Sequence, residues 1–279
     1  MRMIHSRGGC VMPALGLGTW KMGEDRDHRK AEVAALQLGV DLGMTLIDTA
    51  ELYASGGAEE VVGEAIRGRR DGLFIVSKVH PTNATFDGTI RAAEASLRRL
   101  GTDRMDLYLL HNKTGPYPLE GTLEAFDRLK RDGKILHYGL SNFDEPAMEK
   151  VEKMPHGAGV TANQLRYSLA RRALDNGLLD WHAKRDIAVM GYTPLEEGFL
   201  RPKPGLATVA ARHGVSPMCI ALAWTLRHPS VVSIPKATNP GHVRDNARAI
   251  DIKLTAEDLA ALDLDYPRPP AGTFDVWGT

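Results

Sequence analysis

Residues 73–111 read LFIVSKVHPTNATFDGTIRAAEASLRRLGTDRMDLYLLH, and this stretch decides the fold. Its two ends, LFIVSKV and MDLYLLH, are apolar without clean alternation, which is typical of parallel strands buried on both faces. Between them, four apolar residues recur at helical spacing: Ile90, Ala93, Leu97 and Leu100. The stretch therefore predicts a strand, a helix and a second strand parallel to the first.

The same alternation extends to both ends of the chain. Strands are predicted over residues 14–19, 45–50, 73–79, 105–111, 136–141, 160–164, 187–193 and 231–235. Helices are predicted over residues 27–42, 58–68, 86–100, 118–132, 145–153, 175–185 and 216–228. Ser216-Pro217 and Asn239-Pro240 each join an N-cap residue to a proline at the first helical position. This alternation predicts an α/β fold, the (β/α)8 TIM barrel, which needs roughly 250 residues.

The length of 279 residues leaves room only for small additions, so we expect a single domain over residues 1–279. The segment RGGCVMP at 7–13 fits half of a short N-terminal hairpin. Residues 255–258, TAED, resemble a capping box that starts a short extra helix before a C-terminal tail. A doubly wound fold would need a GxGxxG turn, and Gly16-Leu17-Gly18 is followed by TWK, so that fingerprint fails.

Composition excludes several classes of function. Lys and Arg number 35, as do Asp and Glu, and this zero net charge argues against a nucleic-acid binder. No apolar run reaches the roughly 18 residues of a membrane helix, and no signal peptide is visible, so no membrane association is expected. Only Cys10 and Cys219 are present, which fits a cytoplasmic protein in a reducing compartment. Apart from His111, the histidines show no ligand spacing, so no metal site is expected.

Active sites of such barrels lie at the C-terminal ends of the strands. The polar residues at those ends are Asp48, Lys78, His111, Ser141, Asn142, Gln164, Tyr192 and Lys236, and Tyr53 lies in the loop after Asp48. Pairing Asp48 with Lys78 would offset the cost of desolvating both. We expect the lysine to lower the pKa of the Tyr53 phenol from about 10, which would make it a usable proton donor.

That combination indicates carbonyl reduction, in which hydride reaches carbon while oxygen takes a proton. His111 is expected to orient and polarise the same oxygen. Taken singly, each residue has a plain structural explanation: an ion pair for Lys78 or Asp48, packing for Tyr53 and a core histidine for His111. The four together at neighbouring strand ends favour a functional site.

An ordered series of motifs over residues 11–266 resembles the aldo-keto reductase superfamily. The motifs are MPALGLGTW (12–20), GMTLIDTAELYASGGAEEVVGEAI (43–66), IVSKV (75–79), DLYLLH (106–111), GLSNF (139–143), NQLRY (163–167), YTPL (192–195) and SIPKATNPGHVRDN (233–246). The sequence is similar above all to prokaryotic members that reduce small aldehydes such as methylglyoxal. The resemblance implies an NADPH-dependent reductase of small aldehydes or ketones in a TIM barrel.

The resemblance also implies a role for each motif residue. The catalytic residues would be Asp48, Tyr53, Lys78 and His111, with Tyr53 as the general acid. The cofactor would contact Thr19, Trp20, Ser141, Asn142, Gln164, Tyr192, Thr193, Pro194, Leu195, Lys236, Ala237, Thr238, His242 and Asn246. The small carbonyl substrate would contact Trp20, Tyr53, His111 and Asn112. In this scheme Tyr192 stacks on the nicotinamide ring, and Lys236 and Thr238 bind the 2′-phosphate at a helix N-terminus.

The sequence departs from the family pattern at several positions. Ala237 and His242 stand where many relatives have serine and arginine, so weaker NADPH binding or some use of NADH is expected. Asn112 replaces a tryptophan that often follows the catalytic histidine. The tail after residue 266 is short, so the pocket is expected to be open unless Phe274 and Trp277 fold back over it.

Two other functions stay open on the sequence. The first is a cofactor-binding regulatory subunit with little turnover, because some relatives associate with ion channels. The second is a Schiff-base aldolase built on Lys78, which needs no nicotinamide. A monomer is expected, since the family is largely monomeric.

Overall fold

Eight parallel strands form one sheet, in a computed structural model that describes residues 1–113 and 115–275. They are β3 (Gly16–Gly18), β4 (Leu46–Asp48), β5 (Phe74–Val79), β6 (Met105–Leu110), β7 (Ile135–Ser141), β8 (Val160–Arg166), β9 (Ala188–Tyr192) and β10 (Val231–Ser233). Their order in the sheet follows the chain from β3 to β10. A parallel bridge between Leu15 and Ser233 joins the two edges, so the sheet closes into the predicted barrel.

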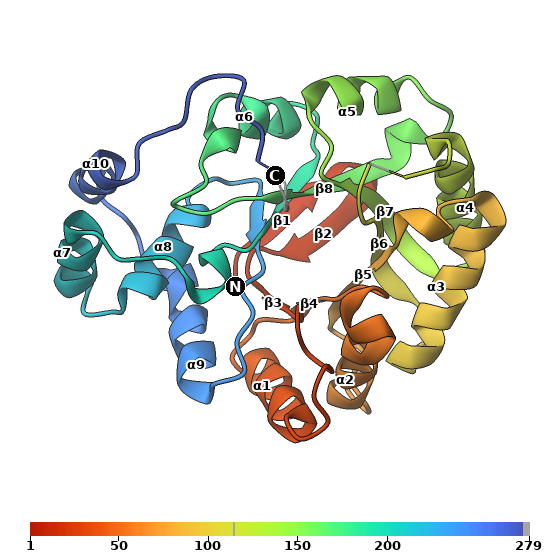
Figure 1. Ribbon diagram of the computed structural model, residues 1–279, viewed down its shortest axis with the longest axis horizontal. Helices are drawn as coiled ribbons and strands as arrows, with labels where there is room; N and C mark the ends of the chain where they lie inside the picture. The colour runs from red at the N-terminus through yellow and green to blue at the C-terminus, as the bar shows by residue number, and fades with distance from the viewer. Residues whose placement is uncertain (114, 276–279) are drawn as a thin grey trace.

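Helices surround the barrel (Figure 1). They are α1 (Arg29–Asp41), α2 (Gly57–Ala65), α3 (Phe86–Leu100), α4 (Leu119–Arg131), α5 (Glu145–Glu152), α6 (Leu178–Ala183), α7 (Pro204–His213), α8 (Pro217–Thr225), α9 (Pro240–Arg248) and α10 (Ala256–Asp265). The predicted caps are confirmed: the side chains of Ser216 and Asn239 accept hydrogen bonds from the first turns of α8 and α9. Thr255 and Asp258 form a complete capping box on α10.

The sequence analysis predicts no helix over the residues that form α7. Leu206 and Val209 of α7 are buried in a cluster with Trp224 of α8 and Leu262 of α10. Figure 1 shows α7 and α10 outside α8, as an added layer on one side of the barrel. Tertiary packing therefore decides this helix. The helix predicted over 175–185 also differs, because Gly177 (φ 108°) interrupts it and α6 starts only at Leu178.

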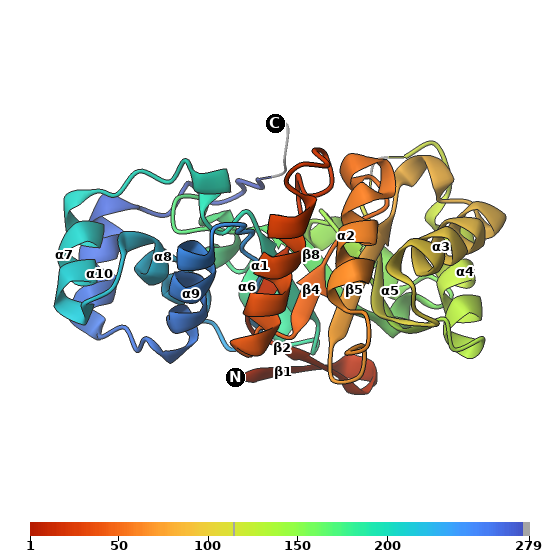
Figure 2. The same ribbon diagram turned by 90° about the horizontal axis from the view of Figure 1, so that it is seen from below.

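The predicted N-terminal hairpin is present, with β1 (Met3–Ser6) and β2 (Cys10–Pro13) paired antiparallel. Figure 2 shows the hairpin and the C-terminal tail at opposite ends of the barrel. Arg7 ties the hairpin to the barrel, since its guanidinium donates to the Val160 carbonyl at 2.5 Å and pairs with Glu152 at 3.0 Å. The hairpin therefore lies at the end where the strands begin, away from the polar strand ends.

Among the described residues, no single helix has the length and apolar character to cross a membrane. Only α7 and α8 together reach that length and composition, and they are bent by 94° at the break between them.

Candidate active site

The four predicted catalytic residues meet at one end of the barrel. Asp48 is the last residue of β4, Lys78 lies near the end of β5 and His111 directly follows β6. Tyr53 starts a short 3-10 helix, Tyr53–Gly56, after β4. Because neighbouring parallel strands end at the same edge of the sheet, these side chains converge although the sequence separates them.

Asp48 and Lys78 form a buried ion pair. The Lys78 ammonium lies 2.8 Å from the Asp48 carboxylate and also donates to the Thr49 carbonyl at 2.8 Å. The Lys78 side chain is 0% exposed. Burial alone would lower the pKa of Lys78, but attraction to Asp48 and Tyr53 raises it above its ordinary value. Lys78 is therefore a permanent cation at neutral pH.

The Tyr53 hydroxyl lies 3.2 Å from the Lys78 ammonium, which also sits 4.8 Å from the centre of the Tyr53 ring. The rings of Trp20 and His111 meet Tyr53 edge-on, with centroids 4.9 and 5.5 Å away. The expected direction of its pKa shift was wrong. Burial raises the pKa of Tyr53 above 10, and Asp48 adds to that rise, which together outweigh the lowering by Lys78. The phenol consequently keeps its proton throughout the neutral range.

His111 is neutral. Burial, together with the charges of Lys78 and His80, lowers the pKa of His111 to about 3. Its Nδ1 is buried without a hydrogen-bond partner among the described residues. A buried unpaired N–H is rarer than a buried unpaired acceptor, so the ring proton belongs on Nε2. The ring can then donate one hydrogen bond through Nε2.

The predicted amide and hydroxyl residues continue around the rim. Gln164 of β8 donates one N–H to the second Asp48 carboxylate oxygen at 2.7 Å, which leaves its other N–H and its amide oxygen for a ligand. The Tyr192 hydroxyl donates to the Asn142 side-chain oxygen at 2.9 Å, and Ser141 donates to the Gln164 carbonyl at 3.0 Å. Asn142 has a left-handed backbone (φ 64°), which turns it away from the line of β7.

The remaining predicted cofactor residues lie on neighbouring elements. Thr19 is buried and donates to the Asp48 carbonyl at 2.9 Å. Thr193 has a left-handed backbone, and its hydroxyl is buried without a partner among the described residues. Lys236 and His242 are exposed, whereas Asn246 of α9 is buried. Pro194 is buried, and the half-buried members of the group are Leu195, Ala237 and Thr238. The buried Thr193 hydroxyl, which lacks a partner among the residues described, and the exposed Lys236 ahead of α9 fit a phosphate-bearing nicotinamide cofactor.

Sequence reasoning missed the charged residues that hold the segment after β9. Glu196 pairs with Arg166 at 2.9 Å and accepts from the Ser168 hydroxyl at 2.6 Å. Glu197 pairs with Lys21 of the loop after β3 at 3.6 Å. Both glutamates have left-handed backbones, so these ion pairs hold a strained turn in place. Their only signal in the sequence is their position directly after the YTPL motif.

The described part of the C-terminal tail contacts two of the loops that follow the strands. The Lys113 ammonium lies 5.9 Å from the centre of the Phe274 ring, and Asp275 pairs with Arg171 at 3.7 Å. The tail thus runs between the loops after β6 and β8. Asn112 is half-buried beside Lys113. Trp277, the other predicted covering residue, lies outside the described residues.

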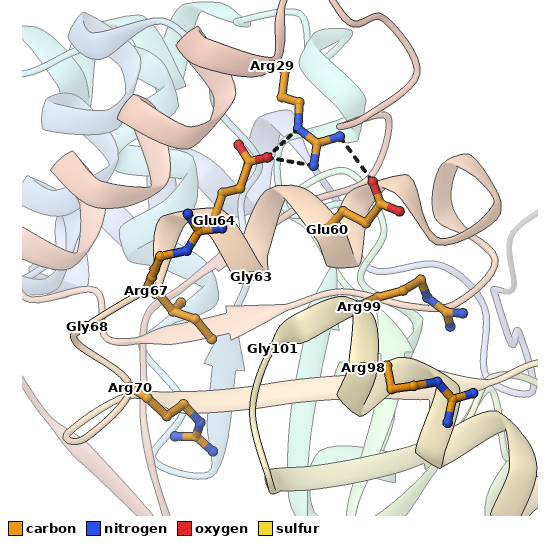
Figure 3. Close-up of a pocket in the computed structure, with 11 residues that line it drawn as sticks. Arg29, Glu60, Gly63, Glu64, Arg67, Gly68, Arg70, Arg98, Arg99 and Gly101 are labelled. Carbon is orange, nitrogen blue, oxygen red and sulfur yellow. Dashed lines mark hydrogen bonds and ion pairs between the residues drawn. The ribbon is translucent and has the colours of Figure 1, made fainter.

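A separate hollow of about 490 Å³ lies between α2 and α3, and none of the predicted site residues lines it. Five of its lining residues are arginines: Arg29, Arg67, Arg70, Arg98 and Arg99. Their guanidinium groups point in different directions (Figure 3), and Arg29 pairs with both Glu60 and Glu64. They do not converge on one anion. In the described part of the chain, no group of three acidic, histidine or cysteine residues is placed to hold a metal.

A buried phenol beside a fixed cation, at the C-terminal mouth of a (β/α)8 barrel, is typical of a carbonyl oxidoreductase. The chain belongs to the aldo/keto reductase family, whose model matches residues 14–264. It is an NADPH-dependent enzyme of that family, and the prediction from the sequence motifs is confirmed.

Individual relatives agree over nearly the whole chain. The methylglyoxal reductase YeaE of Escherichia coli (strain K12) is 45% identical over 278 residues, which cover 98% of this chain and 97% of that protein. The glyoxal reductase of Bacillus subtilis (strain 168) is 33% identical, with 93% and 91% covered. A crystal structure of an aldo-keto reductase from Klebsiella pneumoniae with NADPH has a TM-score of 0.94 at 45% identity, with 99% of each chain covered.

Proposed function

We propose that the protein reduces small α-oxoaldehydes of the methylglyoxal type, with Tyr53 as the proton donor. The observation that carries this proposal is the chain Tyr53–Lys78–Asp48, in which a neutral phenol lies 3.2 Å from a buried ammonium. The names of the Escherichia coli and Bacillus subtilis relatives support the substrate class. Asn112, half-buried beside His111, would give the proposed pocket a polar wall, which suits a substrate carrying a second carbonyl oxygen.

The chemistry divides between cofactor and protein. Bound NADPH supplies the hydride that the carbonyl carbon accepts. Tyr53 gives its proton to the carbonyl oxygen, and the Lys78 ammonium stabilises the phenolate that remains. Asp48 holds Lys78 in place and balances its charge. His111 donates a hydrogen bond from Nε2 to the same oxygen, which polarises the carbonyl and orients it toward Tyr53.

The rim residues are proposed to bind the cofactor. The amide groups of Asn142 and Gln164 and the Ser141 hydroxyl would hold the nicotinamide carboxamide, while Tyr192 faces its ring. Thr193, whose hydroxyl has no partner in the part of the chain that the structure describes, would bind the pyrophosphate. Lys236, at the start of the segment that leads into α9, would bind the 2′-phosphate. With His242 in place of an arginine, NADH is proposed as a weaker alternative cofactor.

Tyr53→Phe tests the proposed proton donor. The substitution removes only the hydroxyl, so kcat for methylglyoxal should fall by about two to four orders of magnitude. NADPH affinity, followed by quenching of intrinsic fluorescence, should stay within about twofold of the wild-type value, because Tyr53 is not among the proposed cofactor contacts.

Turnover near the wild-type rate in Tyr53→Phe would exclude the proton-donor role. NADPH binding by the wild-type protein without consumption of any small aldehyde would instead favour the regulatory-subunit function. Trapping of a substrate on Lys78 by borohydride would favour the aldolase. We further propose a monomeric, cytoplasmic, one-domain enzyme without nucleic-acid partners, which the balanced charge and the short additions to the barrel support.

A further inference from the structure

Glu59, in the first turn of α2, is 0% exposed, and the mechanism above does not use it. One of its carboxylate oxygens accepts a hydrogen bond from the Ser77 hydroxyl at 2.5 Å, and the other pairs with Arg99 Nε at 2.6 Å. Ser77 directly precedes Lys78 on β5, and Arg99 belongs to α3. A buried carboxylate thus connects three elements next to the active site.

The turn that joins Tyr53 to α2 has an unusual backbone. Three consecutive residues are left-handed: Ala54 (φ 49°), Ser55 (φ 53°) and Gly56 (φ 94°). Residues with a Cβ atom avoid this region, so the surroundings must hold the turn. A Cβ atom on Gly56 would lie 2.6 Å from Arg99 Cδ, which places the Arg99 side chain directly against the turn.

The residue that follows the turn is also in close contact with a neighbouring loop. A Cβ atom on Gly57 would lie 2.9 Å from the carbonyl oxygen of Gly23, in the loop after β3. Trp20 of the same loop meets the Tyr53 ring edge-on. The backbone after Tyr53 is therefore in close contact with both the Gly23 loop and Arg99.

We infer that Arg99 and Glu59 are positioning residues for Tyr53, which fix the turn that keeps the Tyr53 hydroxyl within hydrogen-bond distance of Lys78. Glu59 fixes Arg99 from one side and the strand that carries Lys78 from the other, so donor and cation share one support. The inference rests on the proposed role of Tyr53. A small displacement of a reacting group is costly, so loss of this support should appear in turnover.

Arg98 provides a matched control, since it precedes Arg99 on α3, has the same charge and is exposed. Figure 3 shows the two side chains next to each other. Arg99→Ala should lower kcat about tenfold to a hundredfold, with KM and NADPH affinity within about twofold of wild type. Arg98→Ala should leave kcat unchanged. Added guanidinium ion, below denaturing concentration, should restore part of the turnover of Arg99→Ala.

A double-mutant cycle separates positioning from general stability. Arg99→Ala added to Tyr53→Phe should lower the residual rate no further, because the group that Arg99 positions is gone. A further fall comparable to that in the wild-type background would overturn the inference. Equal kcat in Arg99→Ala and Arg98→Ala would also overturn the inference. If Tyr53→Phe is inactive in that case, the proposed proton-donor role of Tyr53 is still supported. A fully active Tyr53→Phe, in contrast, removes the proposed function itself.

Arg99→Lys keeps the inference testable if Arg99→Ala does not fold. Lysine retains the charge and much of the stem against Gly56 but loses the planar group that pairs with Glu59. We expect a smaller fall in kcat, by roughly threefold to tenfold, again without a change in NADPH affinity. In that case, unchanged kcat in Arg99→Lys would overturn the inference.

Discussion

At the scale of residues, burial fixes the protonation of the two groups that are proposed to contact the carbonyl oxygen. Tyr53 keeps its proton because burial raises its pKa, and His111 stays neutral because burial lowers its pKa to about 3. The structure therefore predicts that kcat/KM for methylglyoxal is flat from about pH 5 to 7.5, since neither group titrates there. Steady-state assays across that range, with His111→Asn as the matched variant, check this. An acid limb near pH 6.5 that His111→Asn removes would contradict it.

At the scale of elements, α10 is held to α7 through its own cap. Asp258 accepts from the Thr255 backbone N–H at 2.9 Å and pairs with Arg212 and, at 2.8 Å, with His213. Although burial opposes it, these partners, His213 first, hold the pKa of Asp258 below its usual range. Ionised Asp258 thus contributes to the free energy of unfolding above the pKa that aspartate has in the unfolded chain, about 3.9. That contribution is lost as the pH falls below this value toward the pKa of Asp258 in the folded protein. In urea unfolding, Asp258→Asn should cost about 1 kcal/mol at pH 7 and progressively less below pH 4. The exposed neighbour Glu257→Gln should cost little at either pH, and an equal loss in both variants would contradict the prediction.

At the scale of the whole molecule, the two ends of the barrel have separate tasks. The N-terminal hairpin lies at the end where the strands begin (Figure 2), and the proposed catalytic residues lie at the ends of the strands, on the other side of the barrel. Arg7→Ala breaks the bonds to Val160, Glu152 and Gly157, so the free energy of unfolding should fall by about 1–2 kcal/mol. Its kcat should stay at the wild-type value. Urea titration beside steady-state assays, with exposed Arg67→Ala as control, measures both quantities. Loss of kcat without loss of stability would show that the hairpin acts on the site.

Much of this protein follows from the sequence because its signals are local. The apolar runs, the helical spacing, and the caps Ser216, Asn239 and Thr255 predict the barrel and its added C-terminal helix. Asp48, Lys78 and His111 were identified because a polar residue at the end of a buried strand points to the mouth of a barrel.

Tertiary structure decided the properties that depend on distance and burial. Gln164 reaches Asp48 across 116 residues of sequence, and Glu59 meets Arg99 across 40. No periodic pattern in the sequence indicates either contact. The direction of the Tyr53 pKa shift depends on the balance between burial and the charge of Lys78. The helix α7 depends on the packing of Leu262 against it. Sequence patterns report which face of an element is buried, whereas desolvation and hydrogen-bond geometry arise only when distant elements meet.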